Sequence, residues 1–178
     1  MEKNRQGLLH IYCGDGKGKT SAAVGLAVRA AGCGMKVLVV RFLKTENSGE
    51  VEVLRSIPGI TVTPCDRTFG FVFRMTDEQK QEAALYYQRR FEAAAEEAVQ
   101  GEYDLLVLDE ILASCNYGMV RETSVVEFLK NRPEKLEVVL TGRNPSETFL
   151  ELADYVSEIR MRRHPYEKGI PARRGIEF

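Results

Sequence analysis

A glycine-rich segment between an apolar stretch and an alanine-rich stretch constrains the fold of this chain more than any other feature. It runs Gly14-Asp15-Gly16-Lys17-Gly18-Lys19-Thr20 and follows the apolar stretch 7–13. Residues 21–31 carry Arg29 as their one charged side chain, which is typical of a helix buried on most sides. A strand, a glycine-rich turn and a buried helix in this order predict a phosphate-binding loop in an α/β fold.

The residue types of this loop suit an anionic ligand. Glycines allow backbone N–H groups to converge on a phosphate, and the following helix adds the partial positive charge of its N-terminus. Lys19 can reach the terminal phosphates, and the Thr20 hydroxyl can bind Mg²⁺. The usual pattern places glycine where this chain has Cys13, so the loop is a variant. The predicted nucleotide-binding residues here are Gly14, Asp15, Gly16, Lys17, Gly18, Lys19, Thr20 and Ser21, and a turn without a ligand is the alternative.

An aliphatic stretch that ends in two acids provides the second half of the predicted site. Residues 105–108 continue into Asp109 and Glu110, a pattern in which a buried strand brings a carboxylate toward a metal ion. Taken alone, a solvated strand end explains the two acids equally well. Together with the loop, they predict nucleotide binding, with Thr20, Asp109 and Glu110 as Mg²⁺ ligands. The two motifs leave open which bond of the nucleotide is broken.

Apolar strands alternate with amphipathic helices along the chain. The expected strands are 7–13, 36–43, 60–63, 103–108, 136–140 and 155–161. The expected helices are 21–31, 50–56, 76–100, 123–130 and 145–153, with a Thr76–Gln79 capping box on the third and Asn144 as the N-cap of the last. The buried stripe of the third helix is predicted to be Ala84, Tyr87, Phe91, Ala94 and Ala98. This order predicts a P-loop NTPase (RecA-like) fold, a single domain whose mostly parallel sheet has helices on both faces.

Composition excludes several classes of function. The chain has 25 Lys and Arg against 26 Asp and Glu, so it lacks the basic surplus of a protein that coats nucleic acid. Its longest aliphatic runs are four residues, so we expect no membrane span, and no apolar segment follows Lys3 and Arg5 as in a secretory signal. Four widely spaced cysteines indicate reduced thiols in a cytoplasm. Two histidines exclude a multi-histidine metal site.

The motifs together resemble one family, the ATP:corrinoid adenosyltransferases of the CobA/CobO/BtuR type. The resemblance covers almost the entire chain. Besides the loop and the acidic strand end, it rests on the segments 29–37, Gly70-Phe71-Val72-Phe73, Thr141-Gly142-Arg143, 153–158 and 164–177. The loop alone would be generic, but its coincidence with Thr-Gly-Arg and this tail is specific.

The resemblance implies a reaction and a set of ligands. The 5′-deoxyadenosyl group of ATP passes to the Co(I) of a reduced corrinoid, cobalamin or a precursor, and triphosphate is released, in cobalamin biosynthesis or salvage. Co(I) is a strong nucleophile without a proton to remove, so the protein needs no general base and supplies orientation and electrostatics. The expected catalytic residues are Lys19, Thr20 and Glu110. ATP, Mg²⁺ and the corrinoid are the expected ligands.

The resemblance also assigns the aromatic segment. It implies that Gly70, Phe71 and Phe73 bind the corrinoid, with the rings against its lower face so that no axial ligand reaches cobalt. Family members commonly have tryptophan where this chain has Phe73. Phe69 alternates with the other two rings, so a strand there would put all three on one face, and a core strand is the alternative.

Two arginines are further candidates for nucleotide contact. Arg143 follows an expected buried strand beside a glycine, where strand ends gather around a ligand. Arg29 lies within an otherwise apolar helix, and an ion pair on a solvated stripe is its alternative.

The resemblance further implies a homodimer and a tail, 164–178, that packs near the site. The cluster Arg160, Arg162 and Arg163 is either a solvated edge or a surface for an acidic electron donor such as a flavodoxin- or ferredoxin-like reductant. Three other functions stay open at this point. They are a RecA-like ATPase in which Glu110 activates water, a carrier without catalysis, and a small-molecule kinase.

Overall fold

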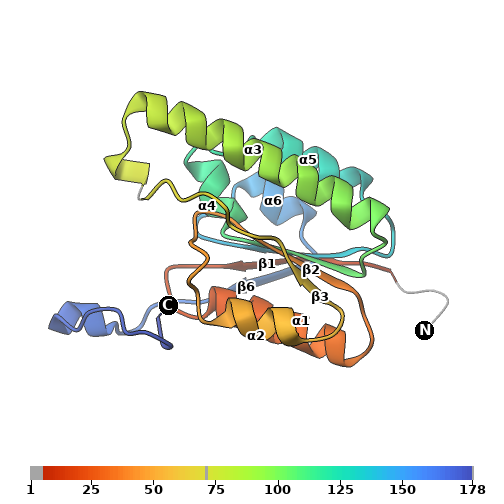
Figure 1. Cartoon of the computed structure of the whole chain (residues 1–178), viewed down its shortest axis with the longest axis horizontal. Coiled ribbons are helices and arrows are strands. Elements are labelled where there is room, and N and C mark those ends of the chain that lie inside the picture. Colours follow the sequence, from red (N-terminus) through yellow and green to blue (C-terminus); the bar gives the residue numbers. More distant parts are fainter. Residues whose placement is uncertain (1–5, 71, 178) are drawn as a thin grey trace.

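The computed structural model describes residues 6–70 and 72–177, and a six-stranded parallel sheet forms its centre (Figure 1). The strands are ordered β3-β2-β4-β5-β1-β6, and every neighbouring pair is parallel. They are β1 (Leu9–Cys13), β2 (Val37–Arg41), β3 (Ile60–Val62), β4 (Leu105–Asp109), β5 (Glu137–Thr141) and β6 (Tyr155–Glu158). The predicted α/β class with a parallel sheet is confirmed.

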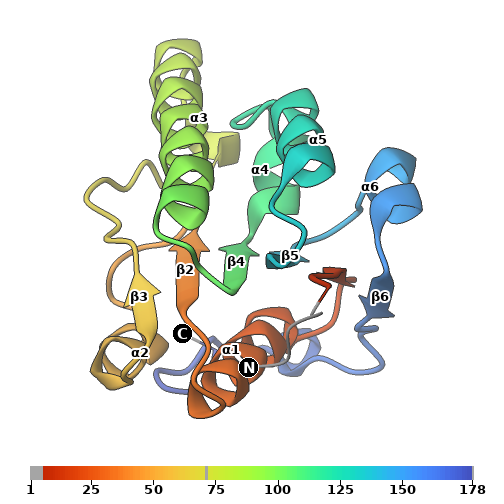
Figure 2. The ribbon, with the colours of Figure 1, turned by 90° about the vertical axis from the view of Figure 1, so that its right-hand side faces the viewer.

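Helices cover both faces of the sheet (Figures 1 and 2). α1 (Lys19–Gly32) and α2 (Glu50–Ser56) lie on one face. The other face carries α3 (Asp77–Gln100), α4 (Ile111–Asn116), α5 (Glu122–Asn131) and α6 (Glu147–Leu152). Two short 3₁₀ turns complete the fold, η1 (Val72–Arg74) and η2 (Pro165–Lys168). Among the described residues, no helix is long and apolar enough to cross a membrane.

The aliphatic strands separate two hydrophobic cores. Along β2, Leu38 and Val40 pack into the core under α3 to α6, whereas Val37 and Val39 pack into the core over α1 and α2. β4 divides its residues in the same way. Because successive side chains of a strand point to opposite faces, a strand covered on both faces needs the continuous apolar runs found in the sequence.

The start of α3 follows a local signal in the sequence. The capping box at the start of α3 is present, because the Thr76 hydroxyl accepts from the Gln79 N–H (3.3 Å) and the Gln79 side chain accepts from the Thr76 N–H (2.9 Å). The predicted stripe needs one correction. Ala83 is fully buried and Ala84 only partly. The stripe that faces the sheet therefore begins one residue earlier than predicted.

Two other expectations were wrong, and one helix was missed. Asn144 is not the N-cap of α6, because the Ser146 hydroxyl accepts from the Phe149 N–H and the helix begins at Glu147. Helix α4 was not expected, since its six residues are too few for a periodic pattern. The last strand ends at Glu158 instead of Met161.

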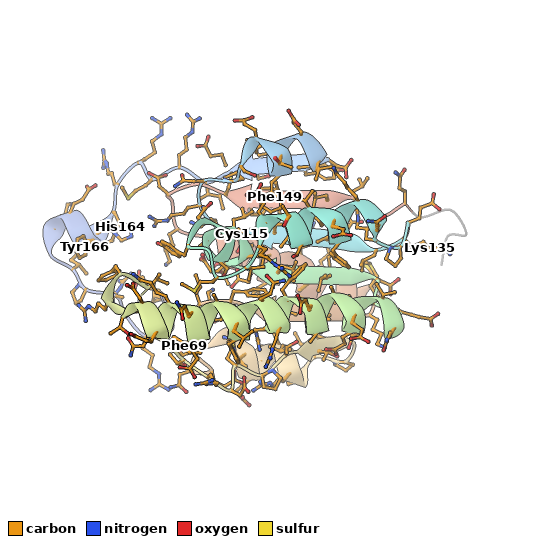
Figure 3. All side chains as sticks on the ribbon, turned by 90° about the horizontal axis from the view of Figure 1, so that it is seen from above. Phe69, Cys115, Lys135, Phe149, His164 and Tyr166 are labelled. Carbon is orange, nitrogen blue, oxygen red and sulfur yellow. The ribbon has the colours of Figure 1, made fainter. Side chains whose placement is uncertain are left out.

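All strands point the same way, so their carboxyl ends meet at one edge of the sheet, on the left of Figure 1. The glycine-rich loop after β1, Asp109 at the end of β4 and Thr141 at the end of β5 gather there. The chain after β6 extends beyond the same edge. In Figure 3 its labelled residues His164 and Tyr166 lie at the opposite end of the molecule from Lys135.

Candidate nucleotide and metal site

The glycine-rich loop packs closely against the chain at the end of β6. Gly14 has φ +107°, and a Cβ built on it would lie 2.3 Å from the carbonyl oxygen of Ile159. A Cβ on Gly16 would lie 2.8 Å from the same oxygen, which accepts a hydrogen bond from the Gly16 N–H (2.8 Å). The glycines at 14 and 16 are therefore required by backbone packing as well as by any phosphate.

Two charged side chains connect this loop with the last part of the chain. The Asp15 carboxylate accepts from the Met161 N–H (2.9 Å), and this hydrogen bond is the main reason why the pKa of Asp15 is lowered. The Lys17 ammonium lies 3.5 Å from a carboxylate oxygen of Glu177. The loop is thus held from outside by segments that follow β6.

Lys19, the first residue of α1, is the buried cation of the loop. Its side chain folds back so that Nζ donates to the carbonyl of Gly16 (2.8 Å), and 8% of the residue is exposed. Burial lowers the pKa of Lys19, while the nearby Glu110 carboxylate acts in the opposite direction. An ammonium in this position suits an anion bound over the loop, because an anion restores the charge balance that burial disturbs.

Asp109 is the centre of the site, and it is 2% exposed. The Thr20 hydroxyl donates to Asp109 Oδ1 (3.0 Å), and the Thr141 hydroxyl donates to the same oxygen (2.7 Å). Thr141 in turn accepts from the Glu110 N–H (2.8 Å). The structure therefore brings the predicted metal ligands Thr20 and Asp109 into direct contact. It adds Thr141 as a residue that holds the Asp109 carboxylate and the backbone of Glu110.

Lys44 is a functional candidate that the sequence interpretation missed. Its Nζ lies 2.5 Å from Asp109 Oδ2 and donates to the Thr20 hydroxyl (2.8 Å). A signal for it was available, because Lys44 closely follows a buried parallel strand and such strand ends gather around ligands.

Glu110 follows Asp109 in a left-handed backbone conformation, with φ +62°. Burial raises the pKa of its carboxyl group, and the neighbouring Asp109 charge raises it further. Glu110 lines a cavity of about 460 Å³. The other residues around this cavity are Leu43, Lys44, Ala113, Asn116, Tyr117, Arg143 and Asn144. Two cations and a carboxyl group thus surround a space beside the glycine-rich loop.

The oxygen ligands present fit a magnesium ion that also binds phosphate. The Thr20 hydroxyl and the Asp109 carboxylate are already adjacent, and Glu110 is the next residue. Within residues 6–70 and 72–177, no group of three or more His, Cys, Asp or Glu side chains forms a metal cage. Mg²⁺ usually keeps several waters and binds through one or two carboxylates plus substrate phosphates, so this set suits it.

The remaining predicted nucleotide residues divide into two groups. Arg143 lines the 460 Å³ cavity, and Ser21 lies in the first turn of α1 next to the loop. Arg29 lies in the last turn of α1 with its side chain exposed, ten residues after Lys19, or about 15 Å along the helix axis. The structure does not bring Arg29 to the loop, because the helix carries it toward the amino-end edge of the sheet.

The aromatic segment is not a strand. Among its described residues, 63–70 form irregular structure and 72–74 form η1. Phe69 packs against Tyr86 and Tyr87 of α3, with ring centroids 5.4 and 5.8 Å apart, and Figure 3 shows it beside that helix. Phe73 is 78% exposed, so these two rings do not share a face. Gly70 has φ +77°, and Phe71 lies outside the described residues.

Comparisons with known proteins agree with this geometry. The family model for the ATP:corrinoid adenosyltransferases BtuR/CobO/CobP matches residues 5–178. The corrinoid adenosyltransferase of Pseudomonas aeruginosa is 33% identical over 177 residues, covering 99% of this chain and 86% of that protein. That of Escherichia coli K12 is 33% identical and that of Salmonella typhimurium 32% identical, each covering 99% of this chain and 88% of the relative.

Solved structures show the fold alone. The cytoplasmic domain of EssC superposes with a TM-score of 0.52 at 15% identity, covering 94% of this chain and 34% of that one. ATPases 2 and 3 of EssC from Geobacillus thermodenitrificans give a TM-score of 0.51 at 14% identity, covering 96% and 36%. The chain therefore spans about a third of each structure's length, and the likeness supports an ATPase-type sheet.

Proposed function

The chain belongs to the BtuR/CobO/CobP family of ATP:corrinoid adenosyltransferases, enzymes that adenosylate corrinoids with ATP, and we propose how its residues perform this reaction. The loop and its neighbours hold the triphosphate of ATP as a leaving group while Co(I) of the corrinoid attacks C5′ of the ribose. The new bond is Co–C5′, and the bond that breaks joins C5′ to the triphosphate oxygen. The electron pair of that bond leaves with the triphosphate.

The observation that carries this proposal is the contact between Thr20 and Asp109 beside the buried Lys19. A triphosphate leaving group gains negative charge in the transition state, and a fixed cation with converging N–H groups stabilises that charge. We assign this role to Lys19 and the amides of 14–20, and the burial of Lys19 against the loop supports the assignment. Arg143 adds a further positive charge at the adjoining cavity, and we propose that Ser21 and the loop amides orient the phosphates.

We propose Mg²⁺ as the metal ion, held by Thr20 and Asp109, with Glu110 completing the site. When bound, the ion neutralises the triphosphate as a Lewis acid. Glu110 then serves as a ligand and not as a base that activates water. Burial raises the pKa of Glu110, and a cation bound beside it would favour the charged form that a metal ligand needs.

The aromatic segment is the proposed corrinoid contact. Gly70 gives the backbone a turn that a side chain would strain, and Phe73 presents its ring to solvent at the carboxyl-end edge of the molecule. We propose that Phe71 and Phe73 pack on the lower face of the corrinoid and keep an axial ligand off cobalt. Without that ligand, Co(II) is reduced to Co(I) more easily.

The surroundings of the reaction are also proposals. The tail 164–178 of a single domain closes the loop side, and the Lys17–Glu177 contact supports this. A homodimer, a flavodoxin- or ferredoxin-like reductant and a cytoplasmic setting complete the proposal. The four cysteines are free thiols, which suits a reducing compartment.

The experiment that tests this function compares the wild-type chain with Lys19→Ala under anaerobic conditions, with ATP, Mg²⁺ and chemically reduced cob(I)alamin. The proposed function predicts a light-sensitive alkylcobalamin from the wild type and a rate lower by about 100-fold or more from the variant. Equal rates for the two proteins would remove Lys19 and the loop from the reaction.

A further inference from the structure

A cation of the chain itself lies at the position proposed for the metal. The Lys44 ammonium donates to the Thr20 hydroxyl (2.8 Å) and lies 2.5 Å from Asp109 Oδ2. These are the two groups that a phosphate-bound metal would use in the proposed function. An ammonium and a metal ion compete for this position, because both are positively charged and both need the same oxygen atoms.

The backbone before Lys44 is bent in a way that directs this side chain to Asp109. The Phe42 N–H still donates to the carbonyl of Asp109 (2.9 Å), so β2 and β4 stay side by side up to that residue. Leu43 then adopts φ +53°, a left-handed conformation that is unfavourable for a residue with a Cβ. Such backbone strain is concentrated at functional sites, where the surrounding structure imposes it.

The Lys44 side chain also has space to move away from Asp109. Its side chain is 21% exposed and borders the cavity of about 460 Å³ that Glu110 and Arg143 line as well. The four-carbon side chain of lysine is flexible and carries a compact charge. Rotation of this side chain alone can therefore take the ammonium from Asp109 toward the cavity, without movement of the strands.

We propose that Lys44 closes the metal position while no nucleotide is bound, and that the arrival of a metal–triphosphate group moves its ammonium onto the phosphates. This inference rests on the proposed function, since it assumes a triphosphate over the loop. It makes Lys44 a residue that both controls metal entry and binds the leaving group. The metal ion and the nucleotide are then expected to bind together, because the metal ion alone has to compete with the Lys44 ammonium.

The first consequence concerns metal binding without nucleotide. With Lys44 in place, Mn²⁺ alone must displace an ammonium to reach Asp109, so the wild type should bind it weakly. Lys44→Gln and Lys44→Met remove that competing charge, and both should bind Mn²⁺ at least about tenfold more tightly. Electron paramagnetic resonance of free Mn²⁺ measures this directly.

The second consequence concerns the phosphates. Inorganic triphosphate with Mg²⁺ should bind the Lys44 variants about tenfold more weakly than the wild type, because the migrating ammonium is missing. Titration calorimetry measures this affinity. The matched control is Lys36→Met, immediately before β2, where the ammonium donates to the carbonyl of Gly101 and lies over the ring of Tyr103. This control should match the wild type in both measurements.

Loss of Lys44 leaves the buried Asp109 carboxylate without its ammonium, so the variants should melt at lower temperature. Mn²⁺ alone should restore part of that loss in the Lys44 variants and should leave the melting temperature of the wild type unchanged. The proposal is overturned when the variants bind Mn²⁺ no more tightly than the wild type, or bind triphosphate as tightly. Adenosylation is assayed separately, so a wild type that makes no alkylcobalamin would refute the proposed function without deciding the role of Lys44.

Discussion

The hydroxyl of Thr141 donates a 2.7 Å hydrogen bond to Asp109, so the end of β5 holds the acid at the end of the neighbouring β4. The same hydroxyl accepts from the Glu110 N–H. One small side chain thereby holds the Asp109 carboxylate and the backbone of the next residue, Glu110. The threonine of the Thr-Gly-Arg segment is therefore a positioning residue, distinct from the groups that contact the ligands.

Thr141→Val keeps the shape of the side chain and removes both hydrogen bonds. We expect it to lower the free energy of unfolding by about 1–3 kcal/mol, because the buried Asp109 carboxylate loses one of its hydrogen bonds and the Glu110 N–H loses its acceptor. Thr61→Val on the edge strand β3 is the control, since its hydroxyl accepts from Tyr103 at an exposed position. Chemical denaturation of both variants measures the two losses of unfolding free energy. Equal losses would show that the Thr141 hydrogen bonds contribute no more to stability than the exposed one of Thr61.

Glu110→Gln should raise the stability of the fold at high pH while it lowers activity. Burial and Asp109 raise the pKa of Glu110, so the folded chain keeps a proton at pH values where the unfolded chain has lost it. The charged form therefore destabilises the fold as pH rises through the raised pKa, and glutamine removes this effect. We expect the variant to melt above the wild type at about pH 8 and to approach it toward about pH 4.

The same variant should turn over more slowly. In the proposed role of metal ligand, the Glu110 carboxylate is not matched by an amide, so Mg²⁺-dependent adenosylation should fall about 10- to 100-fold. Activity at a range of Mg²⁺ concentrations checks this. A variant that is more stable and fully active would remove Glu110 from the metal site.

Gly14→Ala should destabilise the chain by about 2 kcal/mol or more, because its Cβ would meet the Ile159 carbonyl and its φ is positive. Gly25→Ala is the matched control within α1, where a Cβ meets nothing within 4 Å. Alanine there should stabilise the helix by about 0.5–1 kcal/mol. Thermal melting that gave the same sign for both substitutions would contradict the close packing of the loop on β6.

Phe73→Ala should change stability by no more than about 0.5 kcal/mol, because the ring is mostly exposed. Its activity should fall most when the assay starts from Co(II) with a protein reductant, since the ring is proposed to keep an axial ligand off cobalt. Phe69→Ala should instead cost about 2 kcal/mol through lost contacts with Tyr86 and Tyr87. Equal loss of Phe73→Ala activity from chemically prepared Co(I) would argue against this role.

Arg143→Ala should weaken ATP binding about tenfold, because its charge borders the cavity beside the loop. Arg29→Ala should leave ATP affinity unchanged, since Arg29 lies at the far end of α1. Titration calorimetry with ATP and Mg²⁺ compares the two variants. A larger loss for Arg29→Ala would mean that this arginine reaches a nucleotide by a route that the single chain does not show.

The sequence predicted the elements that carry strong local signals. The Thr76–Gln79 capping box placed the start of α3, and the aliphatic runs placed β2 and β4, because a strand covered on both faces tolerates few polar residues. It failed at α4 and at the N-cap of α6. Helix α4 has only six residues, and two polar side chains compete for the N-cap of α6. Tertiary packing therefore decides both features.

The candidate site divides in the same way. Thr20 and Asp109 were predictable, because both belong to motifs whose spacing fixes where they meet. No motif in the sequence marks Lys44 or Thr141 as a residue of the metal site. Their contacts depend on which strands become neighbours and on the bend at Leu43. Arg29 became a candidate because it is the one charged residue of an otherwise apolar helix. The sequence pattern did not show that it lies in the last turn of α1, ten residues after Lys19.

The identity of the phosphate product tests the central claim most directly. The chain is mixed anaerobically with ATP, Mg²⁺ and cob(I)alamin, and the phosphates are separated after one turnover while the corrinoid spectrum is followed. We expect one triphosphate for each alkylcobalamin formed, and no triphosphate when the corrinoid is omitted. Appearance of ADP and phosphate without a cobalt–carbon product would contradict it, and Glu110 would then be a base that activates water.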